Sequence, residues 1–271
     1  MTVDVEDYFQ VSAFERHVAR DDWDRKELRV DGNVKRILEL FARHRVRATF
    51  FVLGWIAQRL PAMVREIANA GHEIASHGSR HMRVTQQGPS EFRDDVTGAK
   101  RVLEDTVGGE VIGYRAATYS ITRDNLWALD VLAETGHRYS SSIYPIRHDL
   151  YGIPSAPRFR FAVGKSGLTE IPITTVTMFG RNWPCGGGGY FRLVPYSVSK
   201  WALRHVNETE GQSGVFYFHP WEIDPEQPRL SGLDLKTKFR HYFNLRKVEN
   251  RVDRLLRDFR WGRMDQVFQL R

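Results

Sequence analysis

The sequence has little cysteine, and this scarcity narrows the chemistry that the chain can perform. A single cysteine among 271 residues, Cys185, excludes an internal disulfide and a site built from several thiolates. Any metal ion would therefore be held by histidine and carboxylate side chains. Cys185 itself lies in the segment 183–186 without an obvious partner for nucleophilic catalysis. We expect it to have a structural role.

Long apolar runs are also lacking. No stretch approaches the length needed to cross a bilayer, so we expect no integral membrane segment. Residues 1–7 contain neither the basic segment nor the apolar segment of a secretion signal. On this basis the chain as given is expected in the cytoplasm, and a trimmed start at Met1 would remove the basis of that expectation.

The net charge of +7 favours acidic partners, and much of it lies in the C-terminal third, as in residues 236–241 and 251–257. Acidic residues are interleaved with these cations, and apolar residues recur at helical spacing. This pattern is typical of a solvated helix face. We therefore predict no nucleic-acid site.

Strand-like and helix-like segments alternate along most of the chain. Residues 48–54 form an apolar, β-prone run, Pro61 begins a helix that ends near Gly71, and residues 73–76 form the next strand. Two strand–helix–strand units in succession predict a parallel α/β sheet. Further strands are predicted at residues 111–115, 139–142, 168–173 and 215–219.

Ionisable side chains stand at the ends of four predicted strands, namely Asp4, His77, Arg115 and His219. Because the carboxyl ends of parallel strands gather at one face, four such residues favour an active site over chance placement. His77 and His81 are separated by three residues, so two neutral imidazoles can point at one divalent cation.

With these residues in view, the chain resembles the polysaccharide deacetylases of the NodB-homology type, family four of the carbohydrate esterases. Within that family it is similar to the bacterial branch associated with exosortase loci and exopolysaccharide synthesis. The segments that carry the resemblance are Asp4-Val5-Glu6-Asp7-Tyr8-Phe9, Gly186 to Arg192, Phe218-His219-Pro220-Trp221-Glu222 and residues 239–245.

The resemblance implies a fold and a cofactor. The fold is α/β, a distorted (β/α) barrel of about seven parallel strands over residues 1–222. A C-terminal helical extension, residues 223–271, would pack on the barrel. The cofactor is one divalent metal ion, and zinc is the expected ion.

The resemblance also assigns roles to individual residues. His77 and His81 match the metal-binding histidines of the family. Asp4 matches the catalytic base, Arg115 the arginine that pairs with the base, and His219 the histidine that protonates the leaving amine.

The carboxylate that completes the metal site has two candidates. Val5 occupies the position after the base at which the family has its metal-binding aspartate. Alternation along an extended strand places Glu6 on the same side as Asp4, whereas a turn after Val5 would bring Asp7 inward. Glu6 is narrowly favoured. The carboxylate that is not a ligand is expected to cap the next helix.

The chain departs from the family pattern at several positions. Gly78 replaces the hydroxyl residue that usually follows the first metal histidine, and Ala116 and Ala117 replace the prolines usual after the arginine. Ser140 stands where an acid is expected, so the charge that orients the catalytic residues would have to come from another residue.

The implied reaction is the hydrolysis of N-acetyl groups on the amino sugars of a bacterial exopolysaccharide, with release of acetate. The partner would be an N-acetylated polysaccharide or oligosaccharide. A backbone amide near Tyr119 would help to hold the oxyanion, and Tyr190 and Trp221 are the aromatic residues expected to stack on sugar rings.

Two other interpretations compete with this one. The same barrel can host a hydrolase of cyclic amides or allantoin-like compounds, which would need a small closed pocket. The departures at Ser140 and at residues 116–117 are also compatible with an inactive glycan-binding module. The presence of the base, both histidines, the arginine and the acid histidine favours an active enzyme.

Overall fold

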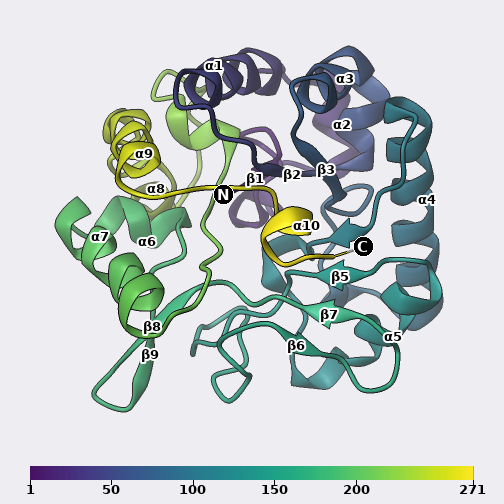
Figure 1. The fold of residues 1–271 in the computed structure, drawn as a ribbon. Coiled ribbons are helices and arrows are strands. Elements are labelled where there is room, and N and C mark those ends of the chain that lie inside the picture. Colours follow the sequence, from purple (N-terminus) through teal and green to yellow (C-terminus); the bar gives the residue numbers. More distant parts are fainter. Residues whose placement is uncertain (271) are drawn as a thin grey trace.

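One curled sheet of eight strands forms the centre of the protein in the computed structural model, which describes residues 1–270 (Figure 1). The order across the sheet is β10-β1-β2-β3-β4-β5-β7-β6. In chain order the strands are β1 (Thr2–Val5), β2 (Thr49–Val52), β3 (Glu73–Ser76), β4 (Gly113–Tyr114), β5 (Tyr139–Ser140), β6 (Phe161–Ala162), β7 (Thr169–Glu170) and β10 (Tyr217–Phe218).

The predicted barrel of about seven parallel strands is confirmed, in a form that curls without closing. Seven strands run parallel, and β6 pairs antiparallel with β7. Among the described strands, the edge strands β10 and β6 do not pair with each other. The sheet is therefore a curled half-barrel.

Helices pack around the sheet (Figure 1). They are α1 (Val30–Arg43), α2 (Gly54–Arg59), α3 (Pro61–Asn69), α4 (Pro89–Val107), α5 (Trp127–Glu134), α6 (Gly188–Leu193), α7 (Tyr196–Arg204), α8 (Leu235–Tyr242), α9 (Leu245–Asp258) and α10 (Met264–Val267). Helix α1 shows why: its apolar side chains recur every three or four residues, and Val34, Ile37 and Phe41 are fully buried. None of the described helices combines the length and the apolarity needed to cross a bilayer.

The parallel arrangement brings four predicted site residues to one face. His77, Arg115 and His219 are the first residues after β3, β4 and β10, and Asp4 lies near the end of β1. Because parallel strands carry their carboxyl ends at the same edge, the side chains that follow them converge. The sheet thus positions the site directly.

The glycine run at residues 186–189 forms part of the regular structure beside β10. Gly188 begins α6, and Gly187 forms a parallel bridge with Tyr217 of β10. Gly187 has a φ of 115°, and a Cβ atom at this position would lie 1.9 Å from the carbonyl oxygen of Tyr217. Glycine is required because the backbone approaches the strand too closely for any side chain.

The structure also shows how helix α4 starts. It begins at Pro89 with Gly88 as its N-cap. The carboxylate of Glu91 accepts a hydrogen bond from the Gly88 amide at 2.9 Å, which fixes this start. In addition, β8 (Thr175–Met178) and β9 (Arg181–Pro184) form an antiparallel hairpin that the sequence pattern did not indicate.

The C-terminal helices pack against the sheet and its outer helices. Helix α9 buries Val248, Val252 and Leu255 in the main apolar cluster. Helix α10 is tied to the amino ends of the strands, because the Met264 amide donates to Thr49 Oγ1 at 2.8 Å. A division into units 1–222 and 223–271 remains a prediction.

Gly113 on β4 offers a test of how tightly the strand beneath the site is packed. A Cβ atom on Gly113 would lie 2.2 Å from Cζ of Tyr139, whereas one on Gly32 of α1 would meet nothing within 4 Å. We expect Gly113→Ala to lower the free energy of unfolding by about 1 to 3 kcal/mol through overpacking. Gly32→Ala should leave it unchanged or raise it by up to about 1 kcal/mol, because alanine favours the helix. Urea denaturation of both variants measures the difference, and equal stabilities would contradict this description of β4.

Candidate active site

A pocket of about 340 Å³ opens where β1, β3, β4 and β10 end. Its volume lies in the range of small-ligand sites. Residues far apart in the sequence meet in it, and most predicted site residues are among them. The predicted residues that line the pocket are Asp4, Glu6, His77, His81, Tyr119, Tyr190, His219 and Trp221.

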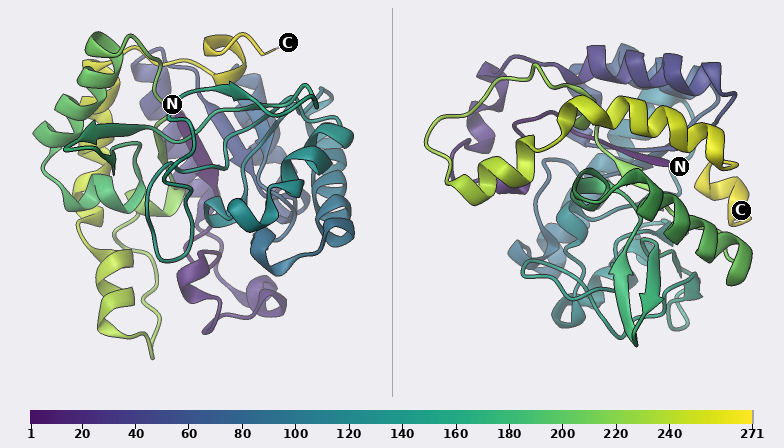
Figure 2. Two further views of the ribbon diagram at one scale, coloured as in Figure 1. Left: turned by 90° about the horizontal axis from the view of Figure 1, so that it is seen from below. Right: turned by 90° about the vertical axis from the view of Figure 1, so that its left-hand side faces the viewer.

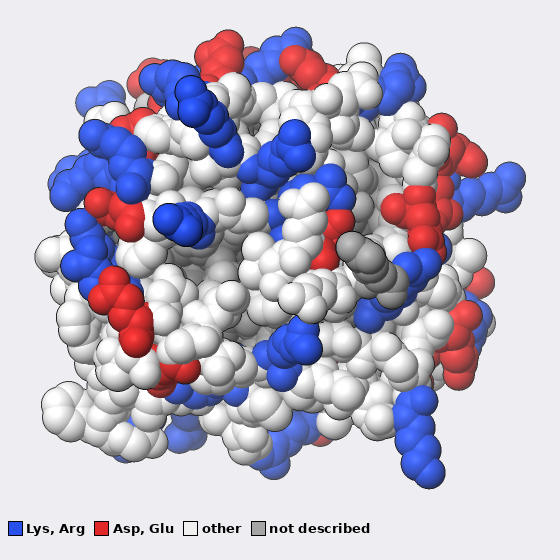
Figure 3. Space-filling view, viewed as in Figure 1, with Lys and Arg blue, Asp and Glu red and all other residues white. Residues whose placement is uncertain are grey.

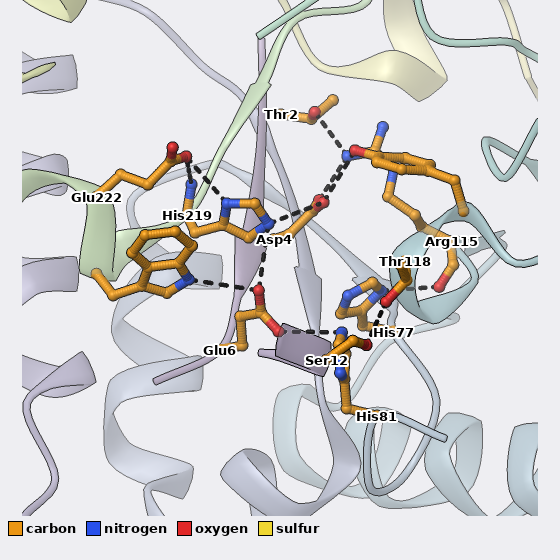
Figure 4. A network of polar contacts seen from close by, with 12 residues as sticks. Thr2, Asp4, Glu6, Ser12, His77, His81, Arg115, Thr118, His219 and Glu222 are labelled. Carbon is orange, nitrogen blue, oxygen red and sulfur yellow. Dashed lines mark hydrogen bonds and ion pairs between the residues drawn. The ribbon is translucent and has the colours of Figure 1, made fainter. Parts of the chain in front are cut away.

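Glu6, His77 and His81 form a buried cluster with the composition of a metal site. One ligand atom from each lies within 4.8 Å of the others, and His81 Nε2 is 3.0 Å from Glu6 Oε2 (Figure 4). His77 Nδ1 lies 2.8 Å from the carbonyl oxygen of Arg115. Because a carbonyl only accepts, Nδ1 carries the proton and the lone pair of Nε2 is free to bind a cation.

The electrostatics of the cluster fit a divalent ion. Burial raises the pKa of the Glu6 carboxyl well above its usual value and lowers the pKa of His77 to about 4, so both imidazoles in the cluster are neutral. Glu6 Oε2 and His81 Nδ1 are buried without a hydrogen-bond partner among the described residues. Buried polar atoms without partners are costly, and a cation held by the cluster would compensate the carboxylate.

Asp7, the other candidate carboxylate, caps a helix. Its Oδ2 accepts hydrogen bonds from the amides of Arg29 at 2.7 Å and Val30 at 2.9 Å, where α1 begins. Its Oδ1 accepts from the Tyr8 amide at 2.8 Å. The structure therefore brings Glu6, and not Asp7, to the histidine pair.

The loop between the two histidines explains why glycine replaces the hydroxyl residue at position 78. Gly78 has a φ of 76°, and a Cβ atom there would lie 2.8 Å from Asp95 Oδ2. Asp95 holds the loop, since its Oδ1 accepts from the Ser79 amide at 3.1 Å. His81 itself has a φ of 52°, a conformation that costs energy for a residue with a side chain. This strain sits at the candidate ligand.

Asp4 and Arg115 form a fully buried ion pair. Arg115 Nη1 donates to Asp4 Oδ1 at 2.5 Å, and the other donors of the guanidinium bind Thr2 and Ser141. The guanidinium carbon also lies 4.0 Å from the centre of the Phe51 ring. The pair is therefore held rigidly, with the second oxygen of Asp4 turned toward the pocket side.

The alanine at position 116 has a structural reason. Its amide donates to Ser142 Oγ at 2.9 Å, a bond that proline could not make. Ser142 is held in turn, because Glu170 Oε1 accepts from its amide at 2.8 Å and Ser140 Oγ donates to its hydroxyl at 2.8 Å. The residues at positions 116 and 140, which differ from the family pattern, thus take part in one hydrogen-bond network of serines behind Arg115.

His219 lies among three carboxylates. Its Nε2 is 3.2 Å from Glu6 Oε1 and 4.0 Å from Asp4 Oδ2, and its Nδ1 is 2.9 Å from Glu222 Oε2 (Figure 4). Burial favours the neutral ring, but Glu6 and Glu222 outweigh burial and raise the pKa of His219 above its usual value. In this environment the imidazole holds a proton.

Glu222 is a site residue to which the sequence analysis assigned no role. Burial opposes its charge, yet Arg192 and His219 lower the pKa of Glu222 to about 2. Arg192 Nε donates to Glu222 Oε1 at 2.7 Å, so the carboxylate is fixed from behind. The sequence does contain a signal for this contact, because Pro220 and Glu222 occupy the first and third positions of a 3₁₀ turn that starts after His219. This is the spacing of a capping box, in which the Glu222 carboxylate accepts a hydrogen bond from the His219 amide.

The two aromatic residues expected to stack on sugar rings have different surroundings in the structure. Trp221 is covered on both faces, by His219 at 5.1 Å and His241 at 4.3 Å between ring centres, so it supports the site and offers no free face for a sugar. This corrects the expected stacking role of Trp221. Tyr190 is half-buried in the pocket wall and keeps the position expected of a substrate contact.

Tyr119 contacts the candidate base through its side chain. Its hydroxyl donates to Asp4 Oδ2 at 3.2 Å, while its amide donates to the Ala116 carbonyl at 3.0 Å and is not free to hold an oxyanion. The neighbouring residue, Thr118, lines the pocket with a φ of 55°. Among the described residues its amide has no acceptor, so Thr118 is the better candidate donor.

Cys185 lies outside the pocket, as a structural residue would. Burial raises the pKa of its thiol to about 12, and its sulfur lies 3.6 Å from the Thr174 carbonyl oxygen. A buried thiol with a raised pKa is a poor nucleophile.

Comparison with known proteins relates both halves of the chain to families. Residues 21–140 match the family model described as Polysaccharide deacetylase, and residues 141–269 match the one described as Domain of unknown function (DUF3473). The chain is 33% identical over 97 residues to a chitooligosaccharide deacetylase of Bradyrhizobium sp. (strain ANU 289). This match covers 36% of the chain and 42% of that protein, so the chain spans less than half the length of this curated relative.

Two solved structures show the same fold at low sequence identity. One is a protein of Mycobacterium smegmatis that is described as a putative polysaccharide deacetylase. Its TM-score is 0.64 at 22% identity, and the match covers 99% of this chain and 88% of that chain. Another is an allantoinase, with a TM-score of 0.58, 18% identity, and coverage of 88% and 71%. The two family matches divide the chain: residues 21–140 match the polysaccharide deacetylase model, and residues 141–269 match the Domain of unknown function (DUF3473).

Proposed function

We propose that the protein is a divalent-metal-dependent hydrolase that removes N-acetyl groups from the amino sugars of a bacterial exopolysaccharide and releases acetate. The proposal rests on one observation: the candidate metal cluster, the Asp4–Arg115 pair and His219 line or border a single pocket. The family of residues 21–140 supports the same reaction class. The similarity to the exosortase-associated branch supports an exopolysaccharide as the substrate.

Glu6, His77 and His81 would hold the ion. When bound, a divalent ion lowers the pKa of a coordinated water and polarises the acetyl carbonyl. Two neutral imidazoles and one carboxylate leave coordination positions open, which is the arrangement of catalytic zinc sites, so zinc is the proposed ion.

Asp4 would act as the general base. Arg115 pairs with the Asp4 carboxylate and fixes one of its oxygens, while the Tyr119 hydroxyl orients the other. The free lone pairs of Asp4 can then take the proton from the water that attacks the acetyl carbon. The amide of Thr118 would donate to the oxyanion.

His219 would act as the general acid. As the bond between carbon and nitrogen breaks, Nε2 delivers its proton to the sugar nitrogen, and the products are acetate and the free amine. Glu222 accepts from Nδ1 and so fixes which nitrogen faces the pocket. In this chain Glu222 would supply the orienting charge that Ser140 cannot supply.

The base and the metal cluster are tested by Asp4→Asn and His77→Ala. We expect either change to reduce acetate release from an N-acetylated oligosaccharide, in the presence of added zinc, by about a hundredfold or more. Allantoin, assayed in parallel, should not be hydrolysed by the wild-type protein. Undiminished acetate release by both variants, or hydrolysis of allantoin alone, would contradict the proposal.

The choice between the two carboxylates is tested by a pair of variants. Glu6→Ala should lose stoichiometric zinc after dialysis because one of three ligands is gone. Asp7→Ala should keep zinc but unfold more easily, by about 1 to 3 kcal/mol, because the first amides of α1 lose their acceptor. Elemental analysis and urea denaturation measure both properties. Loss of zinc from Asp7→Ala with retention by Glu6→Ala would reverse the assignment.

The role of Glu222 is tested by Glu222→Gln, which keeps the shape of the side chain and removes its charge. We expect kcat to fall by about tenfold or more while KM and zinc content are retained, because His219 loses the partner that orients it. A matched control is Glu210→Gln, which removes the charge from another pair, Arg158 and Glu210, joined at 2.6 Å outside the pocket. Equal effects of the two changes on kcat would show that Glu222 acts only through stability.

A further inference from the structure

Helix α8 and the loop before it project from the face on which the pocket opens. In both views of Figure 2 this yellow-green segment stands out from the body of the protein. One side of the helix is anchored: His241 is buried, stacks on Trp221 and bonds Gln227 Oε1 at 2.7 Å. Asp234 caps its start by accepting from the Thr237 amide at 2.9 Å. The helix is therefore held firmly while its other side faces solvent.

The free side carries large apolar side chains. Leu235 is 84% exposed and Phe239 is 51% exposed, and the two are four residues apart on one stripe of the helix. Phe243 lies beside Phe239, with ring centres 4.6 Å apart. An exposed apolar stripe on a projecting helix costs free energy in water unless something covers it.

Cations flank this apolar stripe. Residues 226–247 contain six cationic residues and two acidic ones. Lys236 and Arg240 share a single carboxylate, that of Asp149, at 4.0 and 3.6 Å, and Lys238 is exposed as well. The segment thus presents an excess of positive charge. By contrast, cationic and acidic residues are mixed around the face that carries both termini (Figure 3).

The apolar and basic surface continues into the mouth of the pocket. Arg240 of α8 is one of the residues that line the pocket. Leu150 and Leu193 also line it and are 49% and 47% exposed. The rim of the pocket and the free side of α8 therefore form one surface.

We propose that this surface docks on an anionic lipid bilayer. Leu235 and Phe239 enter the boundary between headgroups and acyl chains, and Lys236 and Lys238 face the acidic headgroups. A bilayer fits better than a second copy of the chain, because a two-fold interface would bring the same cations against each other. Docking places the pocket mouth at the membrane surface and does not depend on the reaction performed inside the pocket.

Vesicle sedimentation tests the proposal with the full chain. Wild-type protein should bind vesicles of phosphatidylcholine mixed with phosphatidylglycerol, bind phosphatidylcholine alone much more weakly, and be released by high salt. The double variants Lys236→Gln/Lys238→Gln and Leu235→Ser/Phe239→Ser should each reduce binding by about tenfold or more. Phe179→Ser is the matched control, since Phe179 is 97% exposed on the β8–β9 turn, away from α8, and its removal should leave binding unchanged.

Several results would overturn the proposal. They are absence of binding by the wild-type protein, equal binding to neutral vesicles, insensitivity to salt, and unchanged binding by both double variants. A wild-type dimer that both double variants convert to monomer would identify a second copy as the occupant. The lipid and salt comparisons use wild-type protein alone, so they decide the question even if a variant folds poorly.

Discussion

The carboxylate of Glu6 joins the two parts of the site. One oxygen lies 3.0 Å from His81 Nε2, and the other lies 3.2 Å from His219 Nε2. A carboxylate buried to this extent is stable as an anion only beside positive charge. His219 supplies part of that charge, and a cation on the histidine pair would supply the rest. The candidate metal site and the candidate acid therefore share one residue, and the surrounding sheet holds that residue in place.

The site is completed by segments from the whole length of the chain. Asp4 and Glu6 precede the segment that matches the polysaccharide deacetylase family, and His77, His81 and Arg115 lie within it. His219 and Glu222 belong to the segment that matches the domain of unknown function. Arg192 ties the latter segment together, since it bonds Glu222 and the backbone carbonyl of His241. The segment that matches the domain of unknown function therefore supplies the candidate acid, His219, and the residues that support it.

Much of the fold could be predicted from sequence because the apolar periods are strong. The buried run of β2 and the stripe of α1 each specify one kind of element, and their alternation specifies a parallel sheet. The β8–β9 hairpin and the order at Gly187 were not predictable, because they depend on contacts with distant segments.

The convergence of Asp4 and Arg115 followed from their positions at strand ends. The sequence alone did not determine which carboxylate faces the histidines. That depends on the amides at the start of α1, which donate hydrogen bonds to Asp7. Likewise, the sequence favoured Trp221 as a sugar contact because it does not show that His241, twenty residues later, stacks on the indole ring.

The proposed mechanism depends on Glu6, His77 and His81 binding one divalent ion in the pocket. The most direct measurement is anomalous diffraction at the zinc edge from crystals of the wild-type protein grown with zinc. We expect one strong peak within about 2.0 to 2.2 Å of a ligand atom from each of these three residues. A peak on Asp7, a peak between His219 and Glu222, or no peak in the pocket would contradict it.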